Sequence, residues 1–102
     1  MRANQSIPVA RRTAILLVKL RVADYQTWKK VFDSMEPLRL EHGIAASTIL
    51  RDVADSNIIV IINYALTVEG AKHHAESQAL RDAMALAGMQ GAPEVNILEE
   101  VN

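Results

Sequence analysis

One stretch decides the fold of this chain of 102 residues: Asn57-Ile58-Ile59-Val60-Ile61-Ile62-Asn63-Tyr64-Ala65-Leu66. Its five consecutive β-branched apolar residues predict a β-strand. The run is apolar at odd and even positions alike, so we expect both faces of the strand to be covered. A chain of this length has little material with which to cover two faces of a sheet, and this mismatch suggests that a partner supplies part of the cover.

Composition excludes several classes of function. Half of the residues are apolar and 23% are charged, which is typical of a globular domain. The net charge of −1 argues against a nucleic-acid partner, which would need a basic surplus. The absence of cysteine removes disulfides, thiolate metal sites and cysteine nucleophiles. No apolar run approaches the roughly 20 residues of a membrane helix, and no secretory signal is indicated, so we expect a cytoplasmic protein without a membrane partner.

The rest of the chain divides into a short tail and one domain. Residues 1–12 show no periodic pattern, and we expect a loose tail there, followed by a single domain over 13–102. Alternating or continuous apolar residues predict three further strands, at 13–22, 45–53 and 94–101. Turn residues at 54–57 predict a hairpin between the second and third strands.

Two helical regions are predicted between these strands. Asp24 is expected to cap the first region, and Pro37 is expected to kink it because proline has no N–H to donate. Thr67 is expected to cap the second region, and Ser77 to cap a further segment over 78–87. Glycine-containing stops end these helices: Gly43, Gly88 and Gly91-Ala92-Pro93.

The resulting order, β-α-β-β-α-β, predicts an α+β fold of the ferredoxin-like kind, with a four-stranded antiparallel sheet and both helical regions on one face. The other face would then be bare and apolar, with Ile15 and Leu17 beside one side of the central strand. Burying ~600 Å² of it per subunit, at ~25 cal/mol per Å², would favour pairing by ~15 kcal/mol before association costs. We therefore expect a homodimer packed sheet to sheet.

Histidines are the first candidates for chemistry. His73 and His74 are neighbours on the second helical region and must point about 100° apart. His74 lies nearer the apolar stripe and is expected to point inward, where it could act as an acid or base. His73 follows Glu69 by four residues, which suits an exposed ion pair. His42, in the last turn of the first helical region, is either a helix-end contact or a group at the mouth of a pocket.

Polar and aromatic residues complete the candidate site. Asn63 and Tyr64 interrupt the apolar strand and must face opposite sides of the sheet; the sequence leaves open which one faces the helices. Trp28 and Phe32 recur at helical spacing, which suits either the core or a wall against a ligand. Two arginines are interpreted as solvated surface residues rather than as a site for an acidic substrate: Arg39 and Arg51.

Several segments resemble the dimeric α+β barrel proteins, among them the antibiotic-biosynthesis-monooxygenase-like proteins. The segments that carry the resemblance are Val22-Ala23-Asp24-Tyr25-Gln26-Thr27-Trp28-Lys29-Lys30-Val31-Phe32-Asp33, Glu41-His42-Gly43-Ile44, Asp55-Ser56-Asn57 and Ala87-Gly88-Met89-Gln90-Gly91-Ala92-Pro93-Glu94. The resemblance covers about residues 13–100 and implies that two ferredoxin-like subunits form a dimeric barrel, with a pocket in each between the sheet and its helices. The chain departs from the oxygenase pattern of that group in having no tryptophan in the predicted sheet.

The resemblance implies an enzyme without cofactor, monooxygenase-, cyclase- or isomerase-like, that acts on a small aromatic or cyclic molecule. Within that reading the catalytic candidates are His74, Asn63 and Tyr64, the ligand-binding candidates are Trp28, Phe32 and His42, and neither a metal nor a cofactor is expected. His74 would move a proton, and Asn63 or Tyr64 would hold an oxyanion. The alternative is a non-catalytic ligand-binding or oligomerisation module.

Overall fold

A computed structural model describes residues 14–101, so the tail expected at 1–12 lies outside the described residues. The chain forms eight helices and strands over this range: β1 (Ala14–Val22), α2 (Tyr25–Ser34), α3 (Glu36–Glu41), β2 (Ile44–Arg51), β3 (Ile58–Ala65), α4 (Val68–Ala75), α5 (Gln78–Leu86) and β4 (Met89–Glu99). Among these residues no helix is long and apolar enough to cross a membrane.

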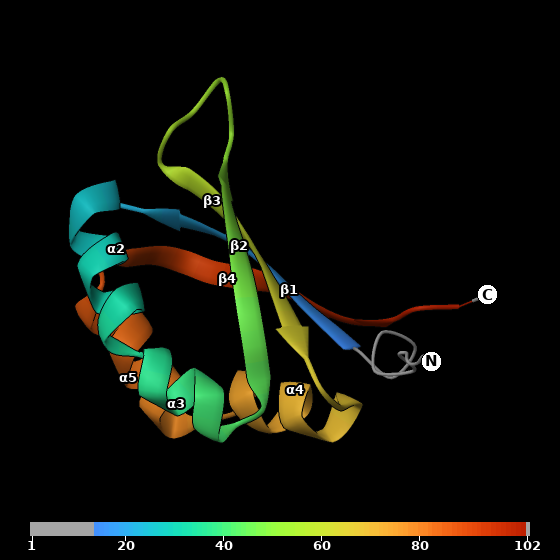
Figure 1. Ribbon diagram of the computed structural model, residues 1–102. Coiled ribbons are helices and arrows are strands. Elements are labelled where there is room, and N and C mark those ends of the chain that lie inside the picture. The colour runs from blue at the N-terminus through green and yellow to red at the C-terminus, as the bar shows by residue number, and fades with distance from the viewer. Residues whose placement is uncertain (1–13, 102) are drawn as a thin grey trace.

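The strands form one antiparallel sheet in the order β2-β3-β1-β4, with the predicted strand β3 in an inner position. Figure 1 shows the helices gathered on one side of this sheet. The predicted ferredoxin-like α+β fold is therefore confirmed.

The helix boundaries follow from local chemistry, largely as the sequence predicts. Asp24 accepts a hydrogen bond from the N–H of Thr27 at 2.9 Å, and Thr67 does the same for Gly70 at 2.9 Å. Ser77 caps α5 through the N–H of Leu80 at 3.2 Å. The break expected near Pro37 is also present, since α2 ends at Ser34 and α3 restarts at Glu36, which leaves the proline in the first turn of α3 where its missing N–H costs nothing.

The last strand is present as predicted, but its predicted bounds were wrong. β4 begins at Met89, five residues before the expected start at position 94, and it ends at Glu99 rather than at position 101. The sequence Gly91-Ala92-Pro93 was expected to end the helical region, but it lies inside the strand as a bulge, because the pairing shifts between Lys19–Glu94 and Arg21–Gln90. Gly91 has φ +73°, which glycine adopts freely, and the proline is tolerated because β4 is an edge strand.

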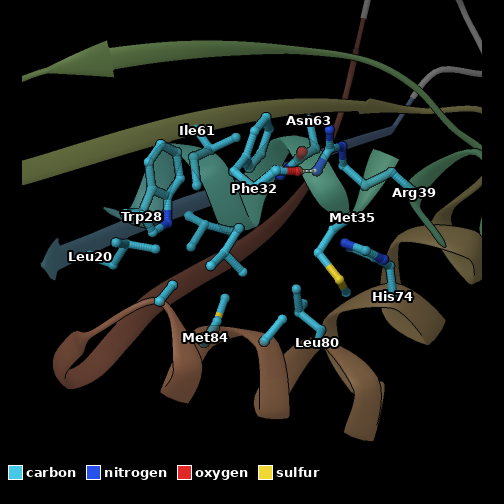
Figure 2. Close-up of a pocket in the computed structure, with 14 residues that line it drawn as sticks. Leu20, Trp28, Phe32, Met35, Arg39, Ile61, Asn63, His74, Leu80 and Met84 are labelled. Atoms are coloured by element: carbon cyan, nitrogen blue, oxygen red, sulfur yellow. Dashed lines mark hydrogen bonds between the residues drawn. The ribbon is translucent and has the colours of Figure 1, made fainter. Parts of the chain in front are cut away.

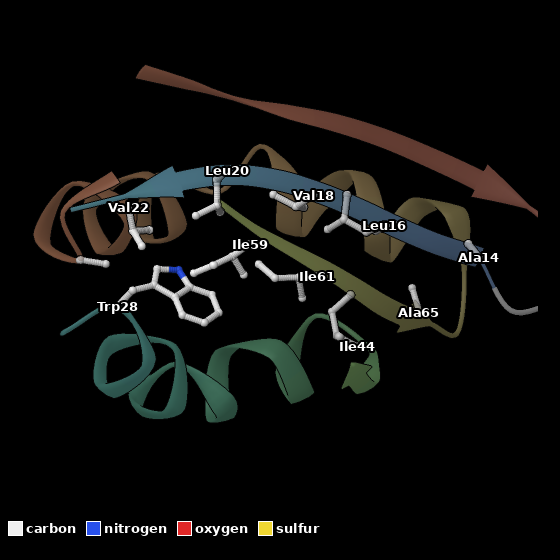
Figure 3. Packing of buried hydrophobic residues seen from close by; sticks show 12 residues of the cluster. Ala14, Leu16, Val18, Leu20, Val22, Trp28, Ile44, Ile59, Ile61 and Ala65 are labelled. Atoms are coloured by element: carbon white, nitrogen blue, oxygen red, sulfur yellow. The ribbon is translucent and has the colours of Figure 1, made fainter. Parts of the chain in front are cut away.

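The core lies between the sheet and the helices (Figure 3). Alternate residues of β1 and β3 point into it, among them Leu16 from β1 and Ile59 and Ile61 from β3, and Trp28 of α2 packs against them. Apolar residues on the opposite sheet face are only half-buried or exposed: Ile15, Leu17, Leu50, Ile58, Val60, Ile62 and Leu98. The division of the central strand into a helix-covered face and a bare apolar face is as predicted.

Candidate functional site

A pocket lies between the sheet and the helices, on the face that β3 shares with the core (Figure 2). Apolar side chains make up most of its wall: Val18, Leu20, Trp28, Val31, Phe32, Met35, Ile61, Leu80, Ala83, Met84 and Ala87. Three polar side chains interrupt this wall: Arg39, Asn63 and His74. An apolar pocket with a few convergent polar groups is the usual form of a small-molecule site.

The cavity is small, with a volume of about 50 Å³. A single buried water needs roughly 10–15 Å³, so there is room for a few waters. A larger ligand would need side chains to move. Met35 and Met84 line the cavity, and their unbranched thioethers can rotate aside with little cost.

Aromatic rings form one wall of the pocket. The rings of Trp28 and Phe32 stack with their centroids 5.0 Å apart, and the ring centroid of Tyr25, outside the pocket lining, lies 5.8 Å from that of Trp28. Trp28 and Phe32 are one helical turn apart on α2, which is why they share a face. The two aromatic residues proposed from the sequence as a ligand wall thus both line the pocket, and both also pack the core.

Asn63, rather than Tyr64, faces the helices. Its amide is buried; the oxygen accepts from the hydroxyl of Ser47 at 2.7 Å and the nitrogen donates to the carbonyl of Leu16 at 3.1 Å. These bonds fix the amide against the sheet and leave one N–H and one lone pair for another partner. Tyr64 points to the bare face of the sheet and does not line this pocket.

Arg39 was misjudged from the sequence. Its side chain is buried, with 9% exposure, and it lines the pocket, so it is not a solvated surface group. The guanidinium lies 3.7 Å from the centre of the Phe32 ring and donates to the backbone carbonyl of Phe32 at 2.6 Å. Burial lowers the pKa of Arg39, and the charges of Glu36 and Asp33 oppose that shift. Arginine stays protonated in proteins, so the pocket contains a fixed positive charge.

No carboxylate forms an ion pair with Arg39 within residues 14–101, where the ion pairs are Arg21 with Asp55 and Lys29 with Asp33. A buried cation is costly unless it is paired. The signal for its burial was present in the sequence, since Arg39 follows Phe32 by seven residues and Met35 by four and so continues their face of the helix. The second arginine, Arg51, is exposed and stacks on Tyr25 with its Cζ 4.5 Å from the ring centre.

His74 is buried in the pocket wall, with 3% exposure, whereas His73 is exposed. Nδ1 of His74 lies 2.8 Å from Nδ1 of His42, so one ring donates and the other accepts. Burial lowers the pKa of His74 to about 4, and electrostatic repulsion from His42, Arg39 and His73, where these are protonated, lowers it further. At neutral pH the imidazole of His74 is therefore uncharged and can act as a base.

His42 does not line the pocket, but it contacts His74, which does. It is partly exposed at the end of α3, where His73 packs against its ring edge-on with centroids 4.5 Å apart. The periodicity of the sequence could not predict that these two histidines, 32 positions apart, would be in contact. The end of α3 and helix α4 come together only in the folded chain.

Two backbone contacts hold these histidines together. The carbonyl of Gly43, which has φ +82°, accepts from the N–H of Leu66 at 2.9 Å and so joins the end of α3 to the start of α4. Gly70 of α4 lies so close to α3 that a Cβ there would be 2.6 Å from the carbonyl oxygen of His42. The sequence did not mark Gly70 as special. Among the described residues no group of three His, Asp or Glu side chains is arranged to hold a metal ion.

Comparison with known proteins shows what this geometry is similar to. Neither a scan of protein-family models nor a search of curated proteins finds a match. Among solved structures, SnoaB, a cofactor-independent oxygenase from Streptomyces nogalater, aligns with a TM-score of 0.71 at 13% identity, over 89% of this chain and 95% of its own. A provisionally assigned antibiotic biosynthesis monooxygenase from Bordetella bronchiseptica gives 0.73 at 12% identity, over 89% and 99%.

A conserved protein from Methanosarcina mazei Go1 aligns equally well, with a TM-score of 0.73 at 13% identity, over 91% of this chain and 97% of its own. At such low identities the shared property is the fold. The resemblance inferred from the sequence is thus confirmed at that level: the chain has the fold of the antibiotic-biosynthesis-monooxygenase-like proteins.

Proposed function

We propose that the chain is a small enzyme that acts, without a cofactor, on an aromatic or cyclic molecule bearing an acidic oxygen. One observation carries this proposal: Arg39, Asn63 and His74 converge from three different elements on one otherwise apolar pocket. The apolar wall suits a ring, and the unpaired guanidinium suits a phenolate, enolate or carboxylate.

Proton abstraction is the chemistry that these residues would support. Nδ1 of His74 is occupied by His42, which leaves Nε2 to take a proton from a phenol O–H or from a carbon beside a carbonyl. The electron pair left behind would move onto the substrate oxygen, where Arg39 and the remaining N–H of Asn63 would stabilise it. Oxygenation, isomerisation and cyclisation of such molecules can all begin in this way, so the step is common to the reactions implied by the resemblance.

SnoaB, which has the same fold, is a cofactor-independent oxygenase. Its activity is compatible with this first step, although the shared fold alone does not give this chain the same substrate.

Dimerisation by the bare sheet face is part of the proposal. The outer side of β3 presents Ile58, Val60 and Ile62, and on the same face β2 adds Leu50 and β4 adds Leu98, which are 48% and 44% exposed. A continuous apolar surface of this kind is normally covered by a partner. Because the same surface on a second copy is self-complementary, we propose an isologous sheet-to-sheet dimer.

The test of the function is turnover by paired variants. A panel of phenols and cyclic ketones would be offered with oxygen uptake and product formation both recorded. His74→Ala should abolish turnover of any substrate found, while Lys72→Ala, a truncation on the exposed side of α4, should leave it intact. Equal turnover by the His74 variant and wild type would refute the role of His74.

A non-catalytic binding module is the second candidate. One observation favours it: Asn63 already bonds to Ser47 and to the backbone of Leu16, so its burial is explained without a substrate. Under this reading His74→Ala would loosen packing, and ligands would bind without being converted.

A further inference from the structure

We infer that His42 and His74 form a proton relay that connects the pocket with solvent, and this inference rests on the proposed role of His74 as the base. His74 lines the pocket and is buried, while His42 is partly exposed and lies outside the lining. The two rings meet through their Nδ1 atoms at 2.8 Å. His74 thus faces the pocket, and His42 lies nearer to solvent.

The geometry allows the relay because each ring keeps its second nitrogen free. Within residues 14–101, neither Nε2 atom makes a hydrogen bond to another protein group, so each is available at its own end of the pair. The bond between the Nδ1 atoms needs one hydrogen, which can belong to either ring. If His42 holds it, Nε2 of His74 carries a hydrogen; if His74 holds it, Nε2 of His74 is a free base.

The proton count balances for one transfer from substrate to solvent. Nε2 of His74 takes a proton from the substrate, and the Nδ1 proton of His74 moves to Nδ1 of His42. His42, now an imidazolium, loses its Nε2 proton to water or buffer. One proton has left the substrate and one has reached solvent, and both rings are neutral but are now the opposite tautomers, which a proton passing in the reverse direction resets. A cyclase or isomerase would run the same steps backwards to return a proton to its product.

The surrounding charges favour transfer of the proton from His74 to His42 over its retention on His74. The charged or titratable groups that act on His74 are His42 and Arg39 from the end of α3 and His73 from its own helix, and all three lower its pKa when positively charged. The faces of α5, β1 and β3 that line the pocket are uncharged. A proton taken up by His74 is therefore driven towards the more exposed ring of His42.

Rigid packing keeps the two rings aligned. The backbone of His42 rests against Gly70, where no side chain would fit, and the edge of His73 lies against the His42 ring. The hydrogen bond from Leu66 to Gly43 anchors the same corner one residue beyond His42. A relay needs such fixed spacing, because proton transfer requires hydrogen-bond distance at each step.

The decisive variant is His42→Asn. An asparagine amide can take the place of Nδ1 and keep a hydrogen bond to His74, but it cannot accept a proton and release another. With a substrate found in the turnover screen, we expect kcat to fall on the order of 100-fold, as for loss of a proton-transfer group, and added imidazole to restore part of it. Lys72→Gln, at an exposed position of α4, is the control and should leave kcat unchanged. A His42→Asn enzyme with wild-type kcat would overturn the relay.

A second readout does not depend on turnover. In protein labelled with ¹⁵N-histidine, we expect NMR to show one proton coupled to the Nδ1 atoms of both rings. We also expect the ring protons of His74 to exchange with solvent more slowly in His42→Asn than in wild type. Equal exchange rates, or two rings without a shared proton, would refute the relay even if the enzyme is active. A shared, relay-dependent proton without turnover of any substrate would instead support the relay and count against the proposed function.

Discussion

Acid should destabilise this protein through His74 in a way that can be calculated. The unfolded chain binds a proton at His74 below a pKa of about 6.5, whereas the folded chain does so only near pH 4. Between these values the unfolded state holds more protons, so the free energy of unfolding falls as the pH is lowered. The full difference is about 3 kcal/mol, and most of it should be lost between about pH 7.5 and 4.5.

The assay is urea unfolding at both pH values and one fixed protein concentration, for wild type and His74→Asn. The variant removes the titrating ring, so its loss of stability over this range should be smaller than that of wild type by about 2–3 kcal/mol. Asp24 and Asp55, whose pKa values are lowered chiefly by backbone hydrogen bonds from Thr27 and Asn57, also lose stabilisation in acid. Those contributions are present in both proteins and cancel in the comparison.

Lys72→Gln serves as the control, because Lys72 is exposed on the same helix and is not among the groups that shift the pKa of His74. It should keep the wild-type pH dependence. If wild type and His74→Asn lose equal stability over this range, then His74 is not a buried neutral imidazole, and its role as a base at neutral pH fails with it.

Three further predictions test other parts of the structure. Gly70→Ala should lower the free energy of unfolding by about 1–3 kcal/mol in urea melts, because the new Cβ would press on the carbonyl of His42; a stabilised variant would contradict the tight packing of α3 on α4. Wild type should be a dimer by light scattering at micromolar concentration and Ile62→Lys a monomer, since Ile62 lies between Leu17 and Thr48 on the bare face; a monomeric wild type would refute the dimer. Leu16→Ala, in the core between sheet and helices, should lower the free energy of unfolding by about 2–5 kcal/mol in the same urea assay. A smaller loss would contradict the tight packing of the core around Leu16.

The sequence was sufficient for most of the fold because the fold depends on local signals. The β-branched run from Ile58 to Ile62 fixed a strand, and Asp24, Thr67 and Ser77 marked helix starts that the structure keeps. The miss at Gly91-Ala92-Pro93 has a physical reason. Turn residues also build bulges, and only the pairing with β1 decides between the two.

The site was less accessible to prediction because its contacts are long-range. Periodicity placed His74 inward, but it could not show that His42 would meet it across 32 positions. It left open which of Asn63 and Tyr64 faces the helices, since that depends on which sheet face the helices cover. Arg39 was assigned to the surface by its residue type, although its spacing from Phe32 placed it on the buried face of the helix. The prediction for Arg39 relied on the polarity of arginine more than on the position of this residue on the helix.

The central claim is that the pocket binds an aromatic anion through Arg39, and the fluorescence of Trp28 tests it most directly. Trp28 is the only tryptophan of the chain and stands in the pocket wall, so its emission reports on occupancy. Wild type and Arg39→Met would be titrated with benzoate and with benzamide, its neutral counterpart of similar size. We expect benzoate to change the emission of wild type with an affinity on the order of tenfold above that of benzamide, and Arg39→Met to lose this preference. An emission that neither ligand changes, or a preference for benzoate that survives in Arg39→Met, would contradict the account.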